Sequence, residues 1–282
     1  MNGKIWVTVL GMPALIALSG TAWIYAVSEL HLRSFPEPPA FTAAITQDAA
    51  NIERGEHLAR TRGCFGCHGP QLSGEEMWGF AVAPNLPALA RSESASALDA
   101  AIRYGIGRDG RALYSMPSYN FMRLRDEDVA DIIAYLRSQP VVEKVLPRAR
   151  LPWPIRWDIA HGRDDAIAAF LDLVPELKGD ALGDSALARG EYIAMTTCNE
   201  CHGFSLRADT PWDDGSAPDL IIIAAYDEAA FRTLMTTGIA LGDRELDMMS
   251  RVARSRFAYF TEQEISDLYA FLSDMATRAI AR

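Results

Sequence analysis

Two short motifs of cysteine and histidine are the residues of this sequence best suited to chemistry. Each is a Cys-x-x-Cys-His run, formed by Cys64, Cys67 and His68 and again by Cys198, Cys201 and His202. Two thiols at this spacing can form thioether bonds along one edge of a porphyrin, and the histidine can reach its iron from the same side. Each motif therefore predicts a covalently attached c-type haem.

A Cys-x-x-Cys pair alone also occurs in other kinds of site. A zinc ribbon places its second pair about 15–20 residues on, and a thioredoxin-like site lies in a parallel βαβ setting. Here the two pairs lie in different halves of the chain, no such strand pattern surrounds them, and no fifth cysteine is present. The adjacent histidine and the repetition favour haem over zinc, a redox disulfide or a structural bridge.

The two motifs belong to a unit that occurs twice. Arg-Gly-Glu precedes each motif, a proline follows each histidine by 16 residues, and a methionine follows the glycine of a Gly-Ile pair by 11 residues. The paired landmarks are Gly55 and Gly190, Pro84 and Pro218, Gly105 and Gly238, and Met116 and Met249. A period of about 135 residues is that of a domain, which predicts a duplication.

Helical patterns open and close each unit. The segments around Gly55 and Gly190 are expected to be opening helices, and apolar residues recur at helical spacing in Val129 to Arg137 and in Ile265 to Ser273. Acidic residues precede both closing segments, as suits a helix N-terminus. Few alternating apolar runs lie between them, so we expect an all-α fold with little sheet.

The segment from Ile5 to Val27 carries no charge, and Trp6, Trp23 and Tyr25 lie near its ends. Such a length spans a bilayer with some tilt, and aromatic rings favour its interfaces. A signal peptide cleaved near Ala22 is the alternative, but its apolar region is usually only about 7–15 residues long. The sequence therefore predicts a retained transmembrane helix.

Composition and charge exclude two further classes of protein. With 49% hydrophobic and 23% charged residues, the chain can form folded cores and is unlike a disordered chain. A net charge of −10 with only three lysines leaves no broad basic face for a nucleic-acid backbone.

Each half resembles a class I cytochrome c domain, and the whole resembles membrane-anchored dihaem cytochrome c subunits of bacterial respiratory or photosynthetic electron-transfer complexes. The resemblance covers about 180 of the 282 residues. It implies that His68 and His202 are proximal haem ligands. It also implies that the Pro84 and Pro218 carbonyls orient these rings, that Met116 and Met249 are the sixth ligands, and that the closing helices cross the opening ones with Tyr135 and Phe271 near the two glycines.

The second methionine ligand leaves a choice. Met116 lies in a Ser-Met-Pro loop before the closing helix, as in the family, whereas Met248 and Met249 are adjacent and no proline follows them. The offset from Gly238 selects Met249, with Met248 as the alternative. Of the other histidines, His57 is expected to be a partly exposed residue of the opening helix, and His31 and His161 are expected to lie on the surface.

Proline clusters separate the expected units. We expect an anchor, a tether, a first cytochrome c domain, a linker and a second cytochrome c domain at residues 1–28, 29–48, 49–140, 141–183 and 184–282. The linker carries Trp153, Trp157 and an apolar run from Ala166 to Val174. We expect it to cover the junction of the two domains, with an interface to a partner as the alternative.

Iron held by imidazole and thioether has no open position and passes electrons. The expected function is electron transfer through two haem c groups, without catalytic residues, in a subunit of a respiratory or other electron-transport complex. Haem attachment on the oxidising side places both domains in the periplasm, on the bacterial inner membrane, with the N-terminus in the cytoplasm. Other subunits of the membrane-bound complex, and a soluble periplasmic cytochrome or cupredoxin, are the expected partners.

Two alternatives remain at this point. A dihaem enzyme resembling cytochrome c peroxidase or thiosulfate dehydrogenase would have one haem without methionine, and a carrier cleaved near Ala22 would diffuse freely. The sixth ligand of the second haem separates the first alternative from electron transfer alone.

Overall fold

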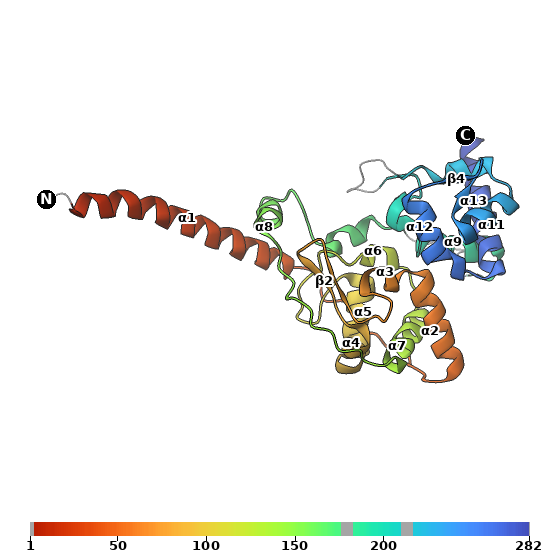
Figure 1. Cartoon of the computed structure of the whole chain (residues 1–282), viewed down its shortest axis with the longest axis horizontal. Helices are drawn as coiled ribbons and strands as arrows, with labels where there is room; N and C mark the ends of the chain where they lie inside the picture. The colour runs from red at the N-terminus through yellow and green to blue at the C-terminus, as the bar shows by residue number, and fades with distance from the viewer. Residues whose placement is uncertain (1–2, 176–182, 210–216, 282) are drawn as a thin grey trace.

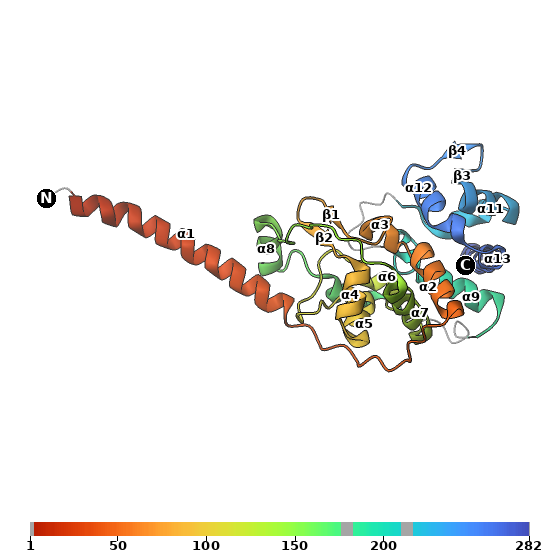
Figure 2. The ribbon, with the colours of Figure 1, turned by 60° about the horizontal axis from the view of Figure 1, so that its bottom comes forward.

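A long helix projects from two helical lobes that lie side by side (Figures 1 and 2). The structure is a computed structural model that describes residues 3–175, 183–209 and 217–281, with side chains from Leu15 onward. The projecting helix is α1 (Gly3–Leu32), which continues five residues beyond the apolar segment predicted from sequence. Its window Leu15–Leu32 is long and apolar enough to cross a membrane by length and composition.

The two lobes use similar elements in a similar order. The first contains α2 (Ala49–Thr61), α3 (Cys64–His68), β1 (Glu75–Met77), β2 (Ala81–Ala83), α4 (Leu86–Ser92), α5 (Ala95–Tyr104), α6 (Ser118–Phe121) and α7 (Asp126–Ser138). The second contains α9 (Ala186–Met195), α10 (Asn199–His202), η3 (Leu220–Ala225), α11 (Glu228–Thr237), β3 (Ile239–Ala240), β4 (Arg244–Glu245), α12 (Met248–Ser255), η4 (Phe257–Tyr259) and α13 (Glu262–Ile280).

The helix-rich class predicted from the sequence is confirmed, with two differences in detail. Each lobe carries a small antiparallel hairpin, β1 with β2 and β3 with β4, where little sheet was expected. These strands are two or three residues long, too short for an alternating apolar pattern to reveal them. The second closing helix, α13, continues seven residues beyond the predicted Ser273.

In each lobe the opening helix crosses the closing helix at a glycine. A Cβ added to Gly55 would lie 2.0 Å from the backbone oxygen of Asp131 on α7, and one added to Gly190 would lie 2.1 Å from that of Asp267 on α13. The next contacts would be with the Cβ atoms of Tyr135 and Phe271, at 2.8 and 2.7 Å. The two crossings are therefore nearly the same, and neither admits a side chain.

An ion pair repeats at both crossings. The arginine before each glycine donates from Nε to a carboxylate of the closing helix, Arg54 to Asp131 at 2.8 Å and Arg189 to Asp267 at 2.6 Å. Both carboxylates are buried, and burial without such a partner would be costly. The crossing thus explains two residues of the Arg-Gly-Glu landmark. It needs the charge of the arginine and the absence of a side chain at the glycine.

The linker contains two packed segments. Its apolar run forms η1 (Ile167–Leu173), which lies against α6. Leu171 and Val174 join Tyr119 of the first lobe and Phe204 of the second in one apolar cluster, and the Tyr119 and Phe204 rings are 5.6 Å apart. This part of the linker covers the junction. The other part, α8 (Trp153–Ala160), packs on α1 instead.

Polar contacts also join the lobes. His57 is a partly exposed residue of α2, as expected, and its Nε2 lies 2.9 Å from the Glu264 carboxylate across the junction. The hydroxyl of Tyr192 accepts from the backbone amide of Arg125 at 3.1 Å and donates to Asp128. Sequence periodicity does not detect such contacts because they join segments far apart in the chain.

Glu264 gives the junction a dependence on pH. Burial alone would raise its pKa, but hydrogen bonds from His57 and from the Thr261 amide together lower the pKa below its ordinary value of 4.5. Because the pKa of Glu264 is lower in the folded than in the unfolded protein, its carboxylate stabilises the folded state above about pH 4.5. This contribution is lost as the pH falls through the folded-state pKa.

We expect Glu264→Gln to lower the free energy of unfolding by about 1–2 kcal/mol at pH 7, because it removes hydrogen bonds to a charged group. Glutamine retains the helix-capping role at this position. Urea unfolding of both proteins at pH 7 and pH 3 should show a difference that shrinks at the lower pH. Glu262→Gln, in the same helical turn, is the control, because it also removes a carboxylate from an ion pair, with Arg232, but this carboxylate is 79% exposed and such surface pairs contribute little. An equal difference at both pH values would contradict the role of the Glu264 charge.

Candidate metal centres

The first motif lies on a helix of five residues. Gly63, in the left-handed conformation at φ 84°, precedes α3, which carries Cys64, Cys67 and His68. Nδ1 of His68 donates to the carbonyl oxygen of Pro84 at 2.8 Å. This hydrogen bond fixes the ring and its tautomer, so Nε2 keeps the lone pair that binds a metal. Burial lowers the pKa of His68, which favours the neutral ring.

The second motif has the same arrangement. Cys198 lies at the N-terminus of α10, and Nδ1 of His202 donates to the carbonyl oxygen of Pro218 at 2.9 Å. The glycine after each histidine has nearly the same backbone, with φ and ψ of 79° and 167° at Gly69 and 85° and 165° at Gly203. The structure therefore brings each histidine to the proline that lies 16 residues after it.

The described parts of the two loops between histidine and proline share several hydrogen bonds. Leu72 and Leu206 stand four residues after the histidines, are almost fully buried, and both have positive φ, 54° and 63°. Each amide donates to the carbonyl of the glycine after the histidine, at 2.9 and 3.0 Å, and each carbonyl accepts from the residue that begins α4 or η3. Sequence reasoning missed these leucines, although their equal offset from the histidines was a usable signal.

The first thiol of each motif is in surroundings that suit uncharged sulfur, whereas Cys201 is exposed. Burial raises the pKa of Cys64 to about 11 and that of Cys198 to about 12. Redox-active and zinc-binding cysteines act as thiolates, which need a lowered pKa. In the described part of the chain, no three histidine, cysteine or acidic residues are grouped to hold a metal ion. Burial thus fits thioether bonds to a haem better than a zinc site or a redox disulfide.

The candidate methionine ligands differ in how they are packed. Met116 packs against the core of the first lobe together with Cys64, and Met249 packs against the core of the second together with Cys198. Met248 is 60% exposed at the start of α12. Of the two adjacent candidates, only Met249 lies on the side of the core that also holds a cysteine of the motif.

The two motifs lie close to each other across the junction. Arg256, just after α12, donates from Nη1 to Glu200 of the second motif at 2.7 Å. A Cβ added to Gly63 would lie 2.2 Å from its guanidinium, which is therefore also beside the first motif. Burial would lower the pKa of Arg256, but Glu200 and the thiols of Cys201 and Cys67 raise it. One guanidinium, on a side chain that is 17% exposed, therefore lies beside both motifs.

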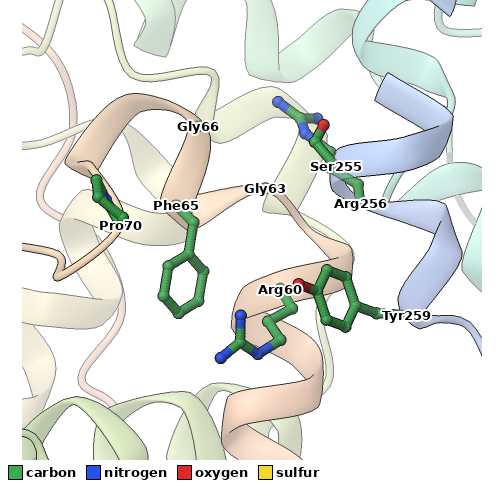
Figure 3. A pocket seen from close by; sticks show the side chains of 8 residues that line it. All are labelled: Arg60, Gly63, Phe65, Gly66, Pro70, Ser255, Arg256 and Tyr259. Carbon is green, nitrogen blue, oxygen red and sulfur yellow. The ribbon is translucent and has the colours of Figure 1, made fainter. Parts of the chain in front are cut away.

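A pocket of about 350 Å³ marks the same junction. Figure 3 shows Arg60 and Phe65 on the side of the first lobe, with Arg256 and Tyr259 on the side of the second. The Arg60 guanidinium lies over the Tyr259 ring at 5.0 Å. The lining includes neither histidine nor methionine of the candidate metal ligands, so the pocket lies beside the first motif and is not a metal site itself.

Comparison with known proteins identifies part of the chain. Residues 52–140 match the family model described as Cytochrome c. These residues form a cytochrome c domain. The match confirms the cytochrome c domain predicted around the first motif. The family implies a covalently bound haem c with its iron. The number of haems, and a second domain of the same family, remain predictions.

Several cytochrome subunits of dehydrogenases are similar to this chain. The gluconate 2-dehydrogenase cytochrome c subunit of Pantoea cypripedii is 29% identical over 181 residues, which are 57% of this chain and 40% of that protein. The cytochrome c subunit of alcohol dehydrogenase (quinone) from Gluconobacter oxydans is 29% identical over 191 residues, 60% of this chain and 39% of that protein.

The fructose dehydrogenase cytochrome subunit of Gluconobacter japonicus is 25% identical over 299 aligned positions, which cover 93% of this chain and 60% of that protein. The chain therefore spans less than two thirds of the length of these relatives. Each of these relatives is named as a cytochrome subunit of a dehydrogenase.

Proposed function

We propose that this chain is a dihaem cytochrome that carries electrons as a subunit of a membrane-bound dehydrogenase complex. The observation that carries the proposal is the repeated histidine site. In both lobes, Nδ1 of the histidine donates to a proline carbonyl, at 2.8 and 2.9 Å, within loops that share their hydrogen bonds. The proposed cytochrome c domains comprise residues 49–140 and 184–282.

The residues that would hold the two haems follow from this geometry. The cysteine pairs would form the thioether bonds, the histidines would bind iron through Nε2, and a methionine of each lobe would be the sixth ligand; these are Cys64, Cys67, His68 and Met116, and Cys198, Cys201, His202 and Met249. Bound haem supplies a one-electron iron couple. The chain orients the histidine rings through Pro84 and Pro218 and packs Cys64, Met116, Cys198 and Met249 against the apolar cores of the two lobes.

The junction supports electron transfer between the two sites. The second motif packs against α6, the helix that follows Met116 and Pro117, and Arg256 lies beside both motifs. Apolar and polar contacts hold the two lobes together on both sides of this region. Electron transfer within one chain requires such a fixed arrangement, because the rate depends on the distance between the cofactors.

Membrane attachment through α1 completes the proposal. The helix would anchor the chain in the bacterial inner membrane with its N-terminus in the cytoplasm, and both lobes would lie in the periplasm, where haem is attached. The partner would be a dehydrogenase that oxidises an alcohol or a sugar derivative, by analogy with the names of the relatives. Electrons would then leave for a membrane component or a soluble periplasmic carrier.

Reaction with carbon monoxide tests the proposal against the alternative of a dihaem enzyme. Both irons of the full-length protein should undergo reversible one-electron reduction, and the reduced spectrum should not change on addition of carbon monoxide, because methionine occupies each sixth position. Binding of carbon monoxide to one reduced haem of the unmodified protein would favour an enzyme with an open site.

A further inference from the structure

The end of α1 is a packed element, unlike its exposed earlier turns. Ile24, Ser28 and Leu32 recur every four residues and are each no more than 1% exposed, so they form one buried stripe. The helix α8 packs against this part of α1. Arg156 of α8 donates from Nη1 to the Ser28 hydroxyl at 2.9 Å. The linker helix α8 is therefore fixed to the C-terminal end of α1, the proposed anchor.

Four aromatic side chains surround this contact, and we call them the aromatic collar: Trp23, Tyr25, Trp153 and Trp157. Each is between 39% and 51% exposed. The Tyr25 and Trp153 rings are 6.1 Å apart, and the Trp153 and Trp157 rings are 6.2 Å apart. Because Trp153 and Trp157 stand four residues apart on α8, they lie on the same face of that helix.

The residues on either side of the collar change in character along α1. Leu15, Ile16 and Leu18, before the collar, are about two-thirds exposed aliphatic side chains. After the collar, Glu29 accepts hydrogen bonds from Arg33 at 3.0 Å and from Arg111 at 3.2 Å. An order of aliphatic, aromatic and charged residues matches the hydrocarbon, headgroup and water layers of a bilayer.

The length of α1 agrees with this placement. Trp6 and Trp23 are separated by 17 residues in the sequence, which is about 26 Å along a helix at a rise of about 1.5 Å per residue. The hydrocarbon core of a bilayer is about 30 Å thick. Tryptophan would then lie at both interfaces, with the collar at the one nearer the two lobes.

We propose that α8 is an interfacial helix whose tryptophans lie in the lipid headgroup layer beside the emerging α1, so that the bilayer surface covers the aromatic collar. The inference rests on the proposed membrane anchor. Figures 1 and 2 place α8 beside the end of α1 and on the side of the first lobe that faces this helix. With two points of contact, the membrane would fix the tilt and height of the first lobe more firmly than the single helix α1 alone.

Spin labels measure the depth of α8 directly. The full-length protein, with its native cysteines bonded to haem, is reconstituted into liposomes of phosphatidylcholine and phosphatidylglycerol. Nitroxides are attached singly to Trp157→Cys and to Pro154→Cys, the second of which keeps both tryptophans of α8. Leu18→Cys is the reference for the hydrocarbon layer, and Ile222→Cys, exposed on the second lobe, is the reference for water.

Relaxation by oxygen, which concentrates in lipid, is compared with relaxation by a water-soluble nickel chelate. The labels at 154 and 157 should have an oxygen-to-nickel ratio between those at 18 and 222, and this intermediate ratio should vanish in protein that is not bound to liposomes. Suppose that the protein floats with liposomes and the label at 18 is protected from the nickel chelate, but the labels at 154 and 157 have the same ratio as the label at 222. The interfacial position of α8 is then wrong, but the anchor stands. Failure to float with liposomes would overturn the anchor and this inference with it.

Discussion

Replacing Met249 with alanine is expected to lower the midpoint potential of one haem and to open that haem to carbon monoxide, whereas Met248→Ala should change neither property. The reason is geometric, since Met249 packs on the core beside Cys198 while Met248 is directed to solvent. Axial ligands set haem potentials over a range of about 0.8 V, and thioether raises the potential. The shift should therefore be a substantial part of that range.

Potentiometric titration followed at the haem absorbance bands measures this shift. Met249→Ala should retain two redox transitions, with one moved to lower potential, and should lose part of the absorption band of oxidised iron bound to methionine sulfur. Met116→Ala should have the same effects on the other haem. A wild-type titration for Met249→Ala together with a shifted one for Met248→Ala would reverse the assignment, and no change in either variant would discredit methionine ligation of the second haem.

Replacing Gly55 with alanine is expected to destabilise the first lobe by about 3 kcal/mol, the upper part of the range for overpacked cores. The added Cβ would meet the backbone oxygen of Asp131 at 2.0 Å. A backbone atom cannot move away by changing a rotamer, so α2 and α7 must separate. Because this crossing positions the helix that leads to the first motif, the yield of protein with haem in that lobe should fall as well.

Gly66→Ala provides a matched control in the same lobe. A Cβ at Gly66 would contact only the end of the Arg256 side chain, at 3.8 Å, and alanine favours a helix over glycine by up to about 1 kcal/mol. Urea unfolding should therefore give a midpoint close to that of the wild type for Gly66→Ala and a much lower one for Gly55→Ala. Equal midpoints for the two variants would contradict the close crossing of α2 and α7.

The sequence was sufficient to predict features that depend on local spacing. The opening and closing helices and the repeated landmarks follow from short motifs and helical periodicity, which depend on residues close together in the chain. The resemblance to class I cytochrome c domains, and not the spacing alone, implied the approach of Tyr135 to Gly55 and the contact of His68 with the Pro84 carbonyl.

Features that depend on contacts between distant segments could not be predicted in this way. Nothing in the pattern around His57 indicates a carboxylate more than 200 residues away, and the same holds for the contact of Arg256 with both motifs. The exposure of Met248 and the packing of Met249 likewise depend on the fold, although the offset from Gly238 had already selected Met249. The packing of α8 on α1 depends on the buried stripe of Ile24, Ser28 and Leu32. This stripe gives no separate signal in the sequence, because the whole segment around its start is apolar.

The number of haems per chain is the most direct test of the central claim that both motifs hold one. Pyridine haemochrome absorbance, divided by protein concentration from amino-acid analysis, should give two haems for the full-length protein and one for Cys198→Ser/Cys201→Ser. Mass spectrometry under denaturing conditions should find the same numbers of covalently attached groups. A value of one for both proteins would show that the second motif carries no haem and would contradict the account.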